Sequence, residues 1–422
     1  MWDKFAGFYR LTPAERLLLL QQFCEISDEE SALLTENQGL PLDLADHMVE
    51  NVIGSFPYPF GVALYFRVNE RDHIVPMVIE ENSVIAAASK AAKIALASGG
   101  FTAQAPESIS IGQVQLIEVP DEDEARTQIL DSKSEILEVA NSCDAILVGH
   151  GGGAVDLELR SIQGSRGPML IADLLVDTKD AMGANTVNTM LEAISPNLEA
   201  LSGGKTCLRI LSNLAVRRVA SASAIFSKDL IGGEEVVDRF LWAVDFAEVD
   251  PFRAATHNKG ILNGVIGVVQ ATGNDSRAIE AGAHAFAAYG HPYKPLTTYS
   301  KTPTGDLLGE IQIPLMVGRI GGITSIHPLA RVAWKILNVN SVGEFCEVLA
   351  AVGLAQNFAA LLALSTEGIQ KGHMKLHASN IALMAGAQND EVDVVVERLI
   401  AAGKITVDYA SEVLEELRSR DC

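Results

Sequence analysis

The sequence predicts an α+β fold of two or three domains. Its 422 residues are enough to bury more than one hydrophobic core. Apolar and polar residues alternate over 62–68 and 73–79, which predicts two paired strands. The alanine-rich run 84–97 predicts a helix that ends at a glycine pair. Residues 108–215 have a different sequence pattern from the preceding segment, because a strand-like run there is followed by acidic helical sequence.

A glycine-rich run in this second segment matches the dinucleotide fingerprint G-x-G-x-x-G/A in its letters but not in its context. The run Gly149–Ala154 follows Ala145–Val148, which we interpret as a strand. The fingerprint must open a helix, whereas Val155–Arg160 alternates like a second strand. The sequence therefore does not predict a Rossmann fold.

The composition disfavours several classes of protein. A net charge of −22 leaves no broad basic face for nucleic acid. The five cysteines have no paired spacing, so we expect a reducing compartment, no disulfides and no C-x-x-C metal site. Thr12, Pro13 and Glu15 form a capping-box pattern, which makes the leucine run that follows a soluble amphipathic helix rather than a leader. No stretch approaches the roughly 20 apolar residues of a membrane span, and we expect a cytoplasmic protein.

One stretch, residues 253–286, combines glycines with a candidate catalytic cation. Lys259 lies between Asn258 and Gly260, and Asp275 follows sixteen residues later in a predicted turn. A partly buried lysine near a carboxylate is a common means of stabilising a developing oxyanion. The same pattern also fits a glycine-rich turn that carries surface charges.

Two predicted helix starts are candidate binding sites. Glu81 precedes Asn82 and Ser83, either of which can cap the helix that follows. The glutamate is either a charge paired with the helix dipole or a positioned acid. The run Asp180–Thr186 also leads into a helix, and its small residues leave backbone N–H groups free for a pyrophosphate. A helix packed tightly on a sheet explains this second run equally well.

The C-terminal part is predicted to be helical. Residues 356–388 are expected to form a long helical region, on which His373 and His377 have the spacing of a zincin-like pair. The glutamate of that motif is missing, Lys375 lies between the histidines, and no third ligand is evident. We therefore expect no metal. The final 40 residues are expected to form a small, charged, amphipathic unit that could move.

Several long strings carry a resemblance to a known family. They are ENVIG at 50–54, VPMVIEENSVIAAAS at 75–89, DAMGANTVNTM at 180–190, RILSNLA at 209–215, RAATHNKGILNG at 253–264, ATGND at 271–275 and TEGIQKGHMKLHASNIA at 366–382. In this order they resemble 3-hydroxy-3-methylglutaryl-coenzyme A reductase in its class II, soluble bacterial form. The resemblance runs nearly from end to end.

The resemblance implies an α+β architecture with an interrupted large domain. A large mixed α/β substrate domain would comprise residues 1–107 and 216–370. A small non-Rossmann α+β dinucleotide-binding domain would comprise 108–215, and a C-terminal helical flap 371–422. The resemblance also implies a homodimer with active sites at the interface, where the segment 50–54 reaches toward the neighbouring subunit. Trimers of dimers, that is hexamers, are known in the class.

The resemblance also implies the reaction and the residues that perform it. The family converts hydroxymethylglutaryl-CoA to mevalonate and coenzyme A with two hydrides from NAD(P)H, through a mevaldehyde-level intermediate. Each hydride addition places negative charge on a carbonyl oxygen, and the family motif puts Lys259 there. Glu81 matches the acid that protonates this oxygen, and Asp275 matches the carboxylate that links the two. His373 matches the donor that protonates the departing coenzyme A thiolate.

Binding residues are carried over in the same way. Ser83 and Arg253 would contact the hydroxymethylglutaryl carboxylate or the coenzyme A phosphates, and Asn213 and Asn263 would hydrogen-bond the substrate. The residues expected to contact the dinucleotide are Asp180, Met182, Gly183, Ala184, Asn185 and Thr186.

Cofactor choice is expected to depend on Asp144, which aligns with the acid that binds the adenosine ribose in NAD-preferring members. A carboxylate there accepts a hydrogen bond from the 2′-OH and repels a 2′-phosphate, so NAD(H) is favoured. Residues 151–156 read GGGAVD where a Cys-Arg-Asp run can follow the glycines, which leaves NADP(H) open.

Two alternatives remain at this stage. The first is a catalytically silent thioester-binding protein on the same scaffold, which retention of Glu81, Lys259, Asp275 and His373 disfavours. The second is an enzyme that works mainly in reverse, oxidising mevalonate for catabolism. The same residues serve both directions, so the sequence does not separate them.

Overall fold

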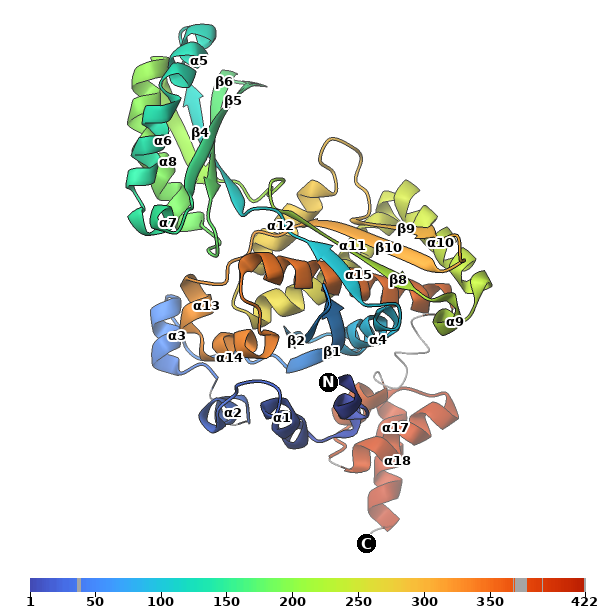
Figure 1. Cartoon of the computed structure of the whole chain (residues 1–422). Coiled ribbons are helices and arrows are strands. Elements are labelled where there is room, and N and C mark those ends of the chain that lie inside the picture. The colour runs from blue at the N-terminus through green and yellow to red at the C-terminus, as the bar shows by residue number, and fades with distance from the viewer. Residues whose placement is uncertain (36–38, 367, 369–377, 389, 421–422) are drawn as a thin grey trace.

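The computed structural model of the chain describes residues 1–35, 39–366, 368, 378–388 and 390–420. Its core consists of two sheets, each with helices packed against it (Figure 1). One sheet has six strands and the other has four. The predicted α+β fold is confirmed.

The six-stranded sheet has the order β2-β1-β3-β8-β10-β9. It begins with an antiparallel hairpin of β1 and β2, and it ends with the antiparallel set β3, β8, β10 and β9. The hairpin confirms the two strands predicted from alternation. The strand bounds are β1 Phe60–Val68, β2 Arg71–Val78, β3 Phe101–Gln104, β8 Val219–Phe226, β9 Thr297–Lys301 and β10 Leu307–Pro314.

Three helices, α4, α11 and α15, form the core that covers this sheet. They are α4 Val84–Leu96, α11 Pro251–Ala271 and α15 Val342–Ser365. On α15, Phe358 stacks on Phe226 of β8 with ring centroids 3.6 Å apart, and both rings are fully buried. Burial of such aromatic area is a large part of the hydrophobic stabilisation of a core.

The length of α15 contradicts one expectation from the sequence. This helix has 24 residues and a mean hydropathy of 1.8 in its most apolar window, long and apolar enough to cross a membrane. However, 72% of that window is buried inside the protein. A helix that is apolar all round is also what the centre of a large core requires.

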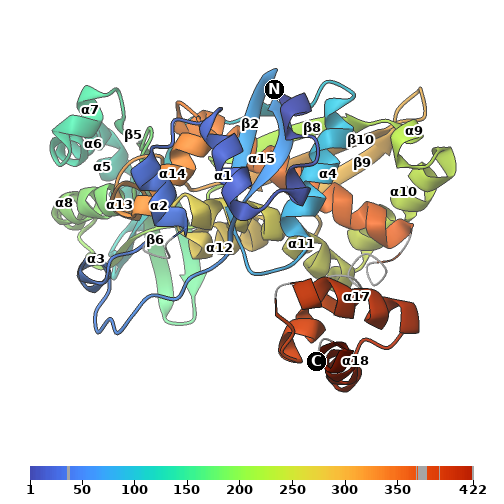
Figure 2. The ribbon, with the colours of Figure 1, turned by 90° about the horizontal axis from the view of Figure 1, so that it is seen from below.

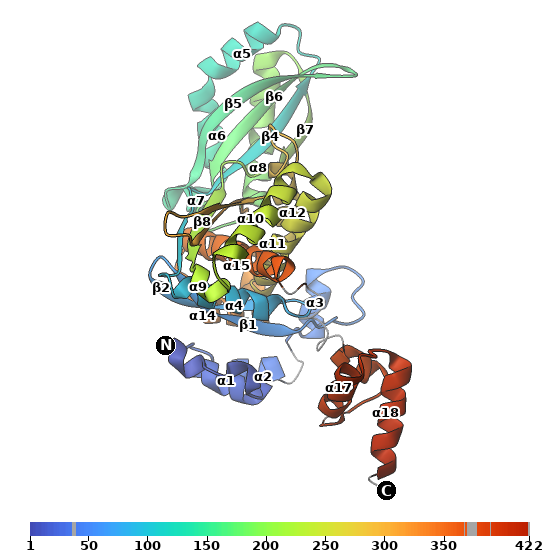
Figure 3. The same cartoon turned by 90° about the vertical axis from the view of Figure 1, so that its right-hand side faces the viewer.

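The second sheet has the order β5-β6-β4-β7 and is antiparallel throughout. Its helices pack on one face and enclose a separate hydrophobic cluster (Figure 3). Without parallel β-α-β units it is not a Rossmann fold, as the sequence predicted. The elements are β4 Ile109–Ile117, α5 Glu122–Asp131, α6 Lys133–Ser142, α7 Ala145–Gly149, β5 Gly153–Gly164, β6 Gly167–Asp177, α8 Ala184–Ser202 and β7 Lys205–Leu211.

One strand expected in this region is instead a helix. Ala145–Val148 lies in α7, whose first turn is capped by the Asp144 carboxylate, which accepts a hydrogen bond from the Leu147 N–H at 2.9 Å. A short apolar run does not by itself distinguish helix from strand, and the capping aspartate decides it. The alternation after Ala154 does form a strand, β5.

Helix starts were predicted correctly where side chains cap them locally. At α1, Thr12 and Glu15 form the expected capping box, with Pro13 in the first turn. At α4 the capping expectation was wrong, because Ser83 has a φ of +75° and its side chain makes no capping hydrogen bond. The N-terminal elements are η1 Trp2–Phe5, η2 Phe8–Arg10, α1 Pro13–Gln21, α2 Asp28–Thr35 and α3 Leu42–Met48.

The C-terminal helices form a third hydrophobic cluster, set apart from the two sheets (Figures 1 and 3). The long helix expected over 356–388 is interrupted, because α15 ends at Ser365 and the next described helical residues are 378–384. Gly368, with a φ of +79°, lies in a conformation that does not continue a helix. The remaining helices are α9 Lys228–Ile231, α10 Glu234–Val249, α12 Ser276–Phe286, α13 Gly322–Ile326, α14 Pro328–Leu337, α17 Asp390–Ala402 and α18 Val407–Arg420.

Candidate active site

Three predicted site residues meet at one carboxylate oxygen. Lys259 Nζ donates to Glu81 Oε2 at 2.8 Å, and Asn263 Nδ2 donates to the same oxygen at 3.2 Å. Glu81 lies in the connection between β2 and α4, while the other two residues lie one turn apart on α11. They meet because α11 packs against β2 and α4. The structure thus brings a carboxylate together with a cation and an amide that lie about 180 residues later in the sequence.

Lys259 lies on a helix, not in the glycine-rich turn that the sequence also allowed. Asp250 caps the start of α11, and Pro251 occupies its first turn. Gly264 faces α15, and a Cβ there would lie 2.9 Å from Gln356 Cβ. Glycine costs a helix roughly 1 kcal/mol relative to alanine, but here it lets two core helices approach closely. Gly260, beside the lysine, has open space where a side chain would be.

The contacts of Asp275 are made within its own helix start. It caps α12, accepting from the backbone N–H groups of Arg277 and Ala278 at 3.0 and 3.3 Å, and it forms an ion pair with Arg277 at 3.1 Å. Burial raises the pKa of Asp275, but the hydrogen bonds from Arg277 and Ala278 outweigh it, so that its pKa lies below the ordinary value. Within the described part of the chain, no hydrogen bond joins Asp275 to Lys259 or Glu81.

The other predicted substrate residues form no hydrogen bond or ion pair with Glu81 or Lys259 in the described part of the chain. Arg253 is half-buried on α11, where burial lowers its pKa, and it has no ion pair with any described carboxylate. Ser83 follows Glu81 by two residues and opens α4. Asn213 is exposed in the connection between β7 and β8. A half-buried guanidinium without a counter-ion favours an anionic ligand.

The predicted dinucleotide residues surround the start of α8. Gly183 precedes this helix with a φ of +91°, and a Cβ there would lie 2.2 Å from the Thr178 methyl group, so only glycine fits. Thr186 Oγ1 donates to Asp144 Oδ2 at 3.1 Å. This bond joins the first turn of α8 to the start of α7. Ala184 completes that first turn together with Asn185, which is exposed.

Two members of the same group also bond to elements of the other sheet. Asp180 Oδ1 accepts from the Val342 N–H at 2.8 Å, which caps the start of α15. The Met182 carbonyl accepts from Arg218 Nη1 at 3.3 Å. Asp180 and Met182 therefore tie the turn before α8 to the six-stranded sheet and its helices.

The expected acid His373 and its neighbour His377 lie outside the described residues. Among the residues that the structure describes, no group of three or more His, Cys, Asp or Glu side chains could hold a metal ion.

A buried polar network beneath α11 was not found from the sequence. His257 Nε2 lies 2.6 Å from Thr297 Oγ1, and the Thr297 hydroxyl donates to Asn357 Oδ1 at 3.0 Å. Burial, with a smaller effect from the Arg253 charge, lowers the pKa of His257 to about 3. The available signal was a histidine on the core-facing side of α11, two residues before the lysine.

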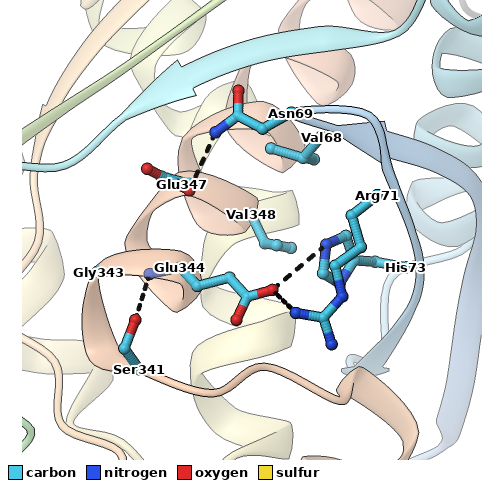
Figure 4. A pocket seen from close by; sticks show the side chains of 9 residues that line it. All are labelled: Val68, Asn69, Arg71, His73, Ser341, Gly343, Glu344, Glu347 and Val348. Atoms are coloured by element: carbon cyan, nitrogen blue, oxygen red, sulfur yellow. Dashed lines mark hydrogen bonds and ion pairs between the residues drawn. The ribbon is translucent and has the colours of Figure 1, made fainter.

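A cavity of about 370 Å³ lies elsewhere, between the β1–β2 turn and the start of α15 (Figure 4). Both of its carboxylates already have partners, since Arg71 forms an ion pair with Glu344 and the Asn69 amide donates to Glu347 at 3.1 Å. None of the predicted site residues lines it. The cavity is therefore separate from the candidate active site.

The site combines the two parts that a dinucleotide-linked oxidoreductase needs. A charged pair suited to a developing oxyanion lies beside one sheet, and a helix start suited to a pyrophosphate lies beside the other. The sequence model of the Hydroxymethylglutaryl-coenzyme A reductase family matches residues 12–378. The chain belongs to this family.

Named relatives agree with the family match. The chain is 56% identical to the 3-hydroxy-3-methylglutaryl-coenzyme A reductase of Archaeoglobus fulgidus, over 99% of this chain and 96% of that protein. It superimposes on the reductase from Streptococcus pneumoniae with a TM-score of 0.84 and 41% identity, over 98% of this chain and 99% of that chain. A class II structure from the same organism, bound to NADPH in open conformations, gives a TM-score of 0.82 and 42% identity, over 97% and 100%. The resemblance seen in the sequence is confirmed.

The neutral, buried His257 predicts a specific pH dependence of stability. Its pKa is about 3 when folded, against about 6.5 in an unfolded chain, so its contribution is complete above pH 6.5 and is lost as the pH falls toward 3. At pH 5 we expect the wild type to have lost roughly 2 kcal/mol of unfolding free energy through this residue.

The measurement is urea unfolding at pH 7 and pH 5 for the wild type and for His257→Gln, in which the amide nitrogen replaces Nε2 as a donor. The variant should show a smaller drop between the two pH values. An identical drop in both proteins would contradict the assignment of this proton.

Proposed function

We propose that the chain interconverts hydroxymethylglutaryl-CoA and mevalonate plus coenzyme A at the Glu81–Lys259 pair. The observation that carries this proposal is the 2.8 Å contact between the two side chains, with Asn263 on the same oxygen. A protein that only bound the thioester would not need an acid and a cation placed side by side.

The roles of the pair follow from charge. Lys259 would stabilise the oxyanion that forms when hydride adds to the thioester carbonyl, and again when it adds to the aldehyde. Glu81, in its protonated form, would deliver the proton that makes the alcohol. Asn263 holds the Glu81 oxygen at 3.2 Å and would orient it toward the substrate. The half-buried Arg253 is the cation available for the carboxylate or phosphates of the substrate.

Two further roles are proposed on the family resemblance. Asp275 would adjust the proton affinity of the pair, which requires it to exchange its ion pair with Arg277 for contacts in the active site. His373 would protonate the departing coenzyme A thiolate. Closure of the C-terminal segment 371–422 after substrate binding would bring it there and exclude water.

We propose that the unit at 108–215 binds the nicotinamide dinucleotide, within a large domain formed by 1–107 and 216–370. The helix N–H groups after Gly183 fit a pyrophosphate, and the Asp144 carboxylate beside Thr186 fits a ribose. The dinucleotide supplies the hydride when bound. NADPH is the cofactor named for the Streptococcus pneumoniae structure, which gives no support to the expected preference for NAD(H).

We also propose a homodimer with shared active sites. Lys259 is 60% exposed and Glu81 is 42% exposed, which is too open for charge stabilisation in a water-excluded site. The loop after α3 projects from the body (Figure 2) and exposes Ile53 fully. Trp242 and Phe252 of α10 and α11 are also exposed, and such apolar surface indicates a protein partner. The location would be cytoplasmic.

The central prediction concerns Lys259. In Lys259→Met, hydride transfer should fall roughly 100- to 1,000-fold, the loss expected when one oxyanion-stabilising group is removed. The measurement is NADH and NADPH oxidation with hydroxymethylglutaryl-CoA. Lys335→Met is the matched control, because Lys335 forms an ion pair with Glu30 at 2.7 Å outside the site. Full activity in Lys259→Met would exclude the role, and an inactive wild type that still binds the acyl-CoA would favour a silent binding protein.

Cofactor choice gives a second prediction. Asp144→Ala removes the charge that repels a 2′-phosphate, so the ratio of kcat/KM for NADPH over NADH should rise by about tenfold, or ~1.4 kcal/mol. The control is Asp121→Ala, because Asp121 caps α5 through Glu124 N at 3.0 Å, in the same unit. An unchanged ratio would mean that another residue sets the preference.

The shared active site gives a third prediction. Ile53→Asp places a charge on the expected interface, so sedimentation should show monomers and specific activity should fall roughly tenfold or more. The control is Leu130→Asp, which alters an apolar residue of α5 that is 48% exposed. Dimers of normal activity in Ile53→Asp would show that the loop lies outside the interface.

A further inference from the structure

Arg218 is a buried cation that has no carboxylate partner among the described ion pairs. Only 3% of its surface is exposed. Its guanidinium donates to the Val317 carbonyl at 2.7 Å, the Met182 carbonyl at 3.3 Å and Ser110 Oγ at 3.4 Å. Burial lowers its pKa. Its hydrogen bonds all go to neutral acceptors, while the buried Asp177 carboxylate, which pairs with Lys179, acts on it only through space and raises its pKa. Burying a charge without a hydrogen-bonded counter-ion is costly, so this position needs an explanation beyond packing.

The three acceptors belong to three different parts of the molecule. Ser110 is in β4 of the four-stranded sheet, and Met182 is in the turn before α8. Val317 follows β10 of the six-stranded sheet. One guanidinium therefore ties the expected dinucleotide turn to both sheets.

Gly318 lies between that turn and the turn that carries Asp275. A Cβ on Gly318 would lie 2.4 Å from the Met182 backbone nitrogen, so the two backbones are in direct contact. On its other side, the Gly318 N–H donates to Asn274 Oδ1 at 2.8 Å. Asn274 immediately precedes Asp275.

The contact continues along the chain. The N–H groups of Arg319 and Ile320 donate to the Asp180 carbonyl at 2.8 and 3.3 Å. Ala181 and Ile320 form an isolated parallel bridge. Segment 317–320 is thus bonded to the dinucleotide turn on one side and to the Asp275 turn on the other.

We propose that Arg218 and Asn274 are positioning residues that hold these two turns in fixed register through the Val317–Gly318 segment. The proposal rests on the proposed function, because it assigns the dinucleotide to one turn and Asp275 to the chemistry. Neither residue touches a reacting atom in this account. Each acts through the backbone of segment 317–320.

The test is a double-mutant cycle with Arg218→Lys and Asn274→Ala. Lysine keeps the charge but cannot reach all three acceptors, and alanine removes the acceptor for the Gly318 N–H. NADPH affinity is read from its fluorescence on binding, independently of turnover, and kcat and KM are measured for both substrates. Arg217→Lys is the matched control, since Arg217 is exposed and bonds Glu158 at 2.8 Å.

We expect each single change to weaken NADPH binding and to lower kcat roughly 10- to 100-fold, because a misplacement of about 1 Å can cost about 100-fold. The KM for hydroxymethylglutaryl-CoA should stay within about twofold, because the Lys259 pair is untouched. The fold loss in NADPH affinity and in kcat of the double variant should be smaller than the product of the two single losses by at least about twofold, because residues of one network are coupled.

The proposal is overturned if the loss in the double variant equals the product of the two single losses. It is also overturned if the Asn274→Ala protein binds NADPH like the wild type. A fall in melting temperature accompanied by equal rises in both KM values would indicate general destabilisation and would also overturn it. If Arg218→Lys does not fold, the NADPH affinity of Asn274→Ala decides alone. An inactive wild type that binds NADPH would count against the proposed function. The double-mutant cycle in NADPH affinity would still test the coupling between Arg218 and Asn274.

Discussion

The close packing of α11 against α15 and β2 is the constraint on which the candidate site depends. Gly264 lets α11 approach Gln356 and Val352 of α15 more closely than any larger residue would. This close approach sets the distance between the exposed face of α11 and the connection between β2 and α4. The 2.8 Å contact between Lys259 and Glu81 is a consequence of this arrangement. Gly264 therefore contributes to the geometry of the site through its packing on α15.

The pair itself contributes little to the stability of the fold. Exposed ion pairs are worth about 0–1 kcal/mol, because water screens them and ordering the side chains opposes them. Lys259 and Glu81 are both exposed, so the pair adds little to folding but places a cation and an acid together. The same charges become far more effective once water is excluded. A partner subunit over the exposed apolar residues near α11 and a closing C-terminal segment would each reduce the local dielectric.

Sequence reasoning succeeded where structure is determined locally and failed where it is determined by tertiary contacts. The capping box at Thr12 and the helix after Gly183 depend on a few neighbouring residues, and both were predicted. Ala145–Val148 was misassigned because a short apolar run fits either structure. The helical state of Lys259 was missed because glycine is locally unfavourable in a helix and only packing on α15 compensates for it.

The site residues themselves came from long strings shared with a family, not from spacing. Arg218 lies in none of these strings and His257 lies in one of them, but the burial of both is visible only in three dimensions.

The candidate site is divided between two sheets, so the two sheets must be held in a defined position relative to each other. The family resemblance alone does not explain how this is achieved. Hydride transfer requires reacting atoms within about 3–3.5 Å, so an error of 1 Å between the two halves is severe. In the described part of the chain, the backbone passes between the halves at residues 105–108 and 212–218. Connections this few would by themselves permit hinge motion. The bonds of Arg218, the contact of Gly318 with Met182 and the Asp180 cap on α15 connect the two halves at the turn before α8 and would limit that motion. Arg218 is a buried cation whose hydrogen bonds go only to neutral acceptors, and its cost in stability is explained if this gain in precision offsets it.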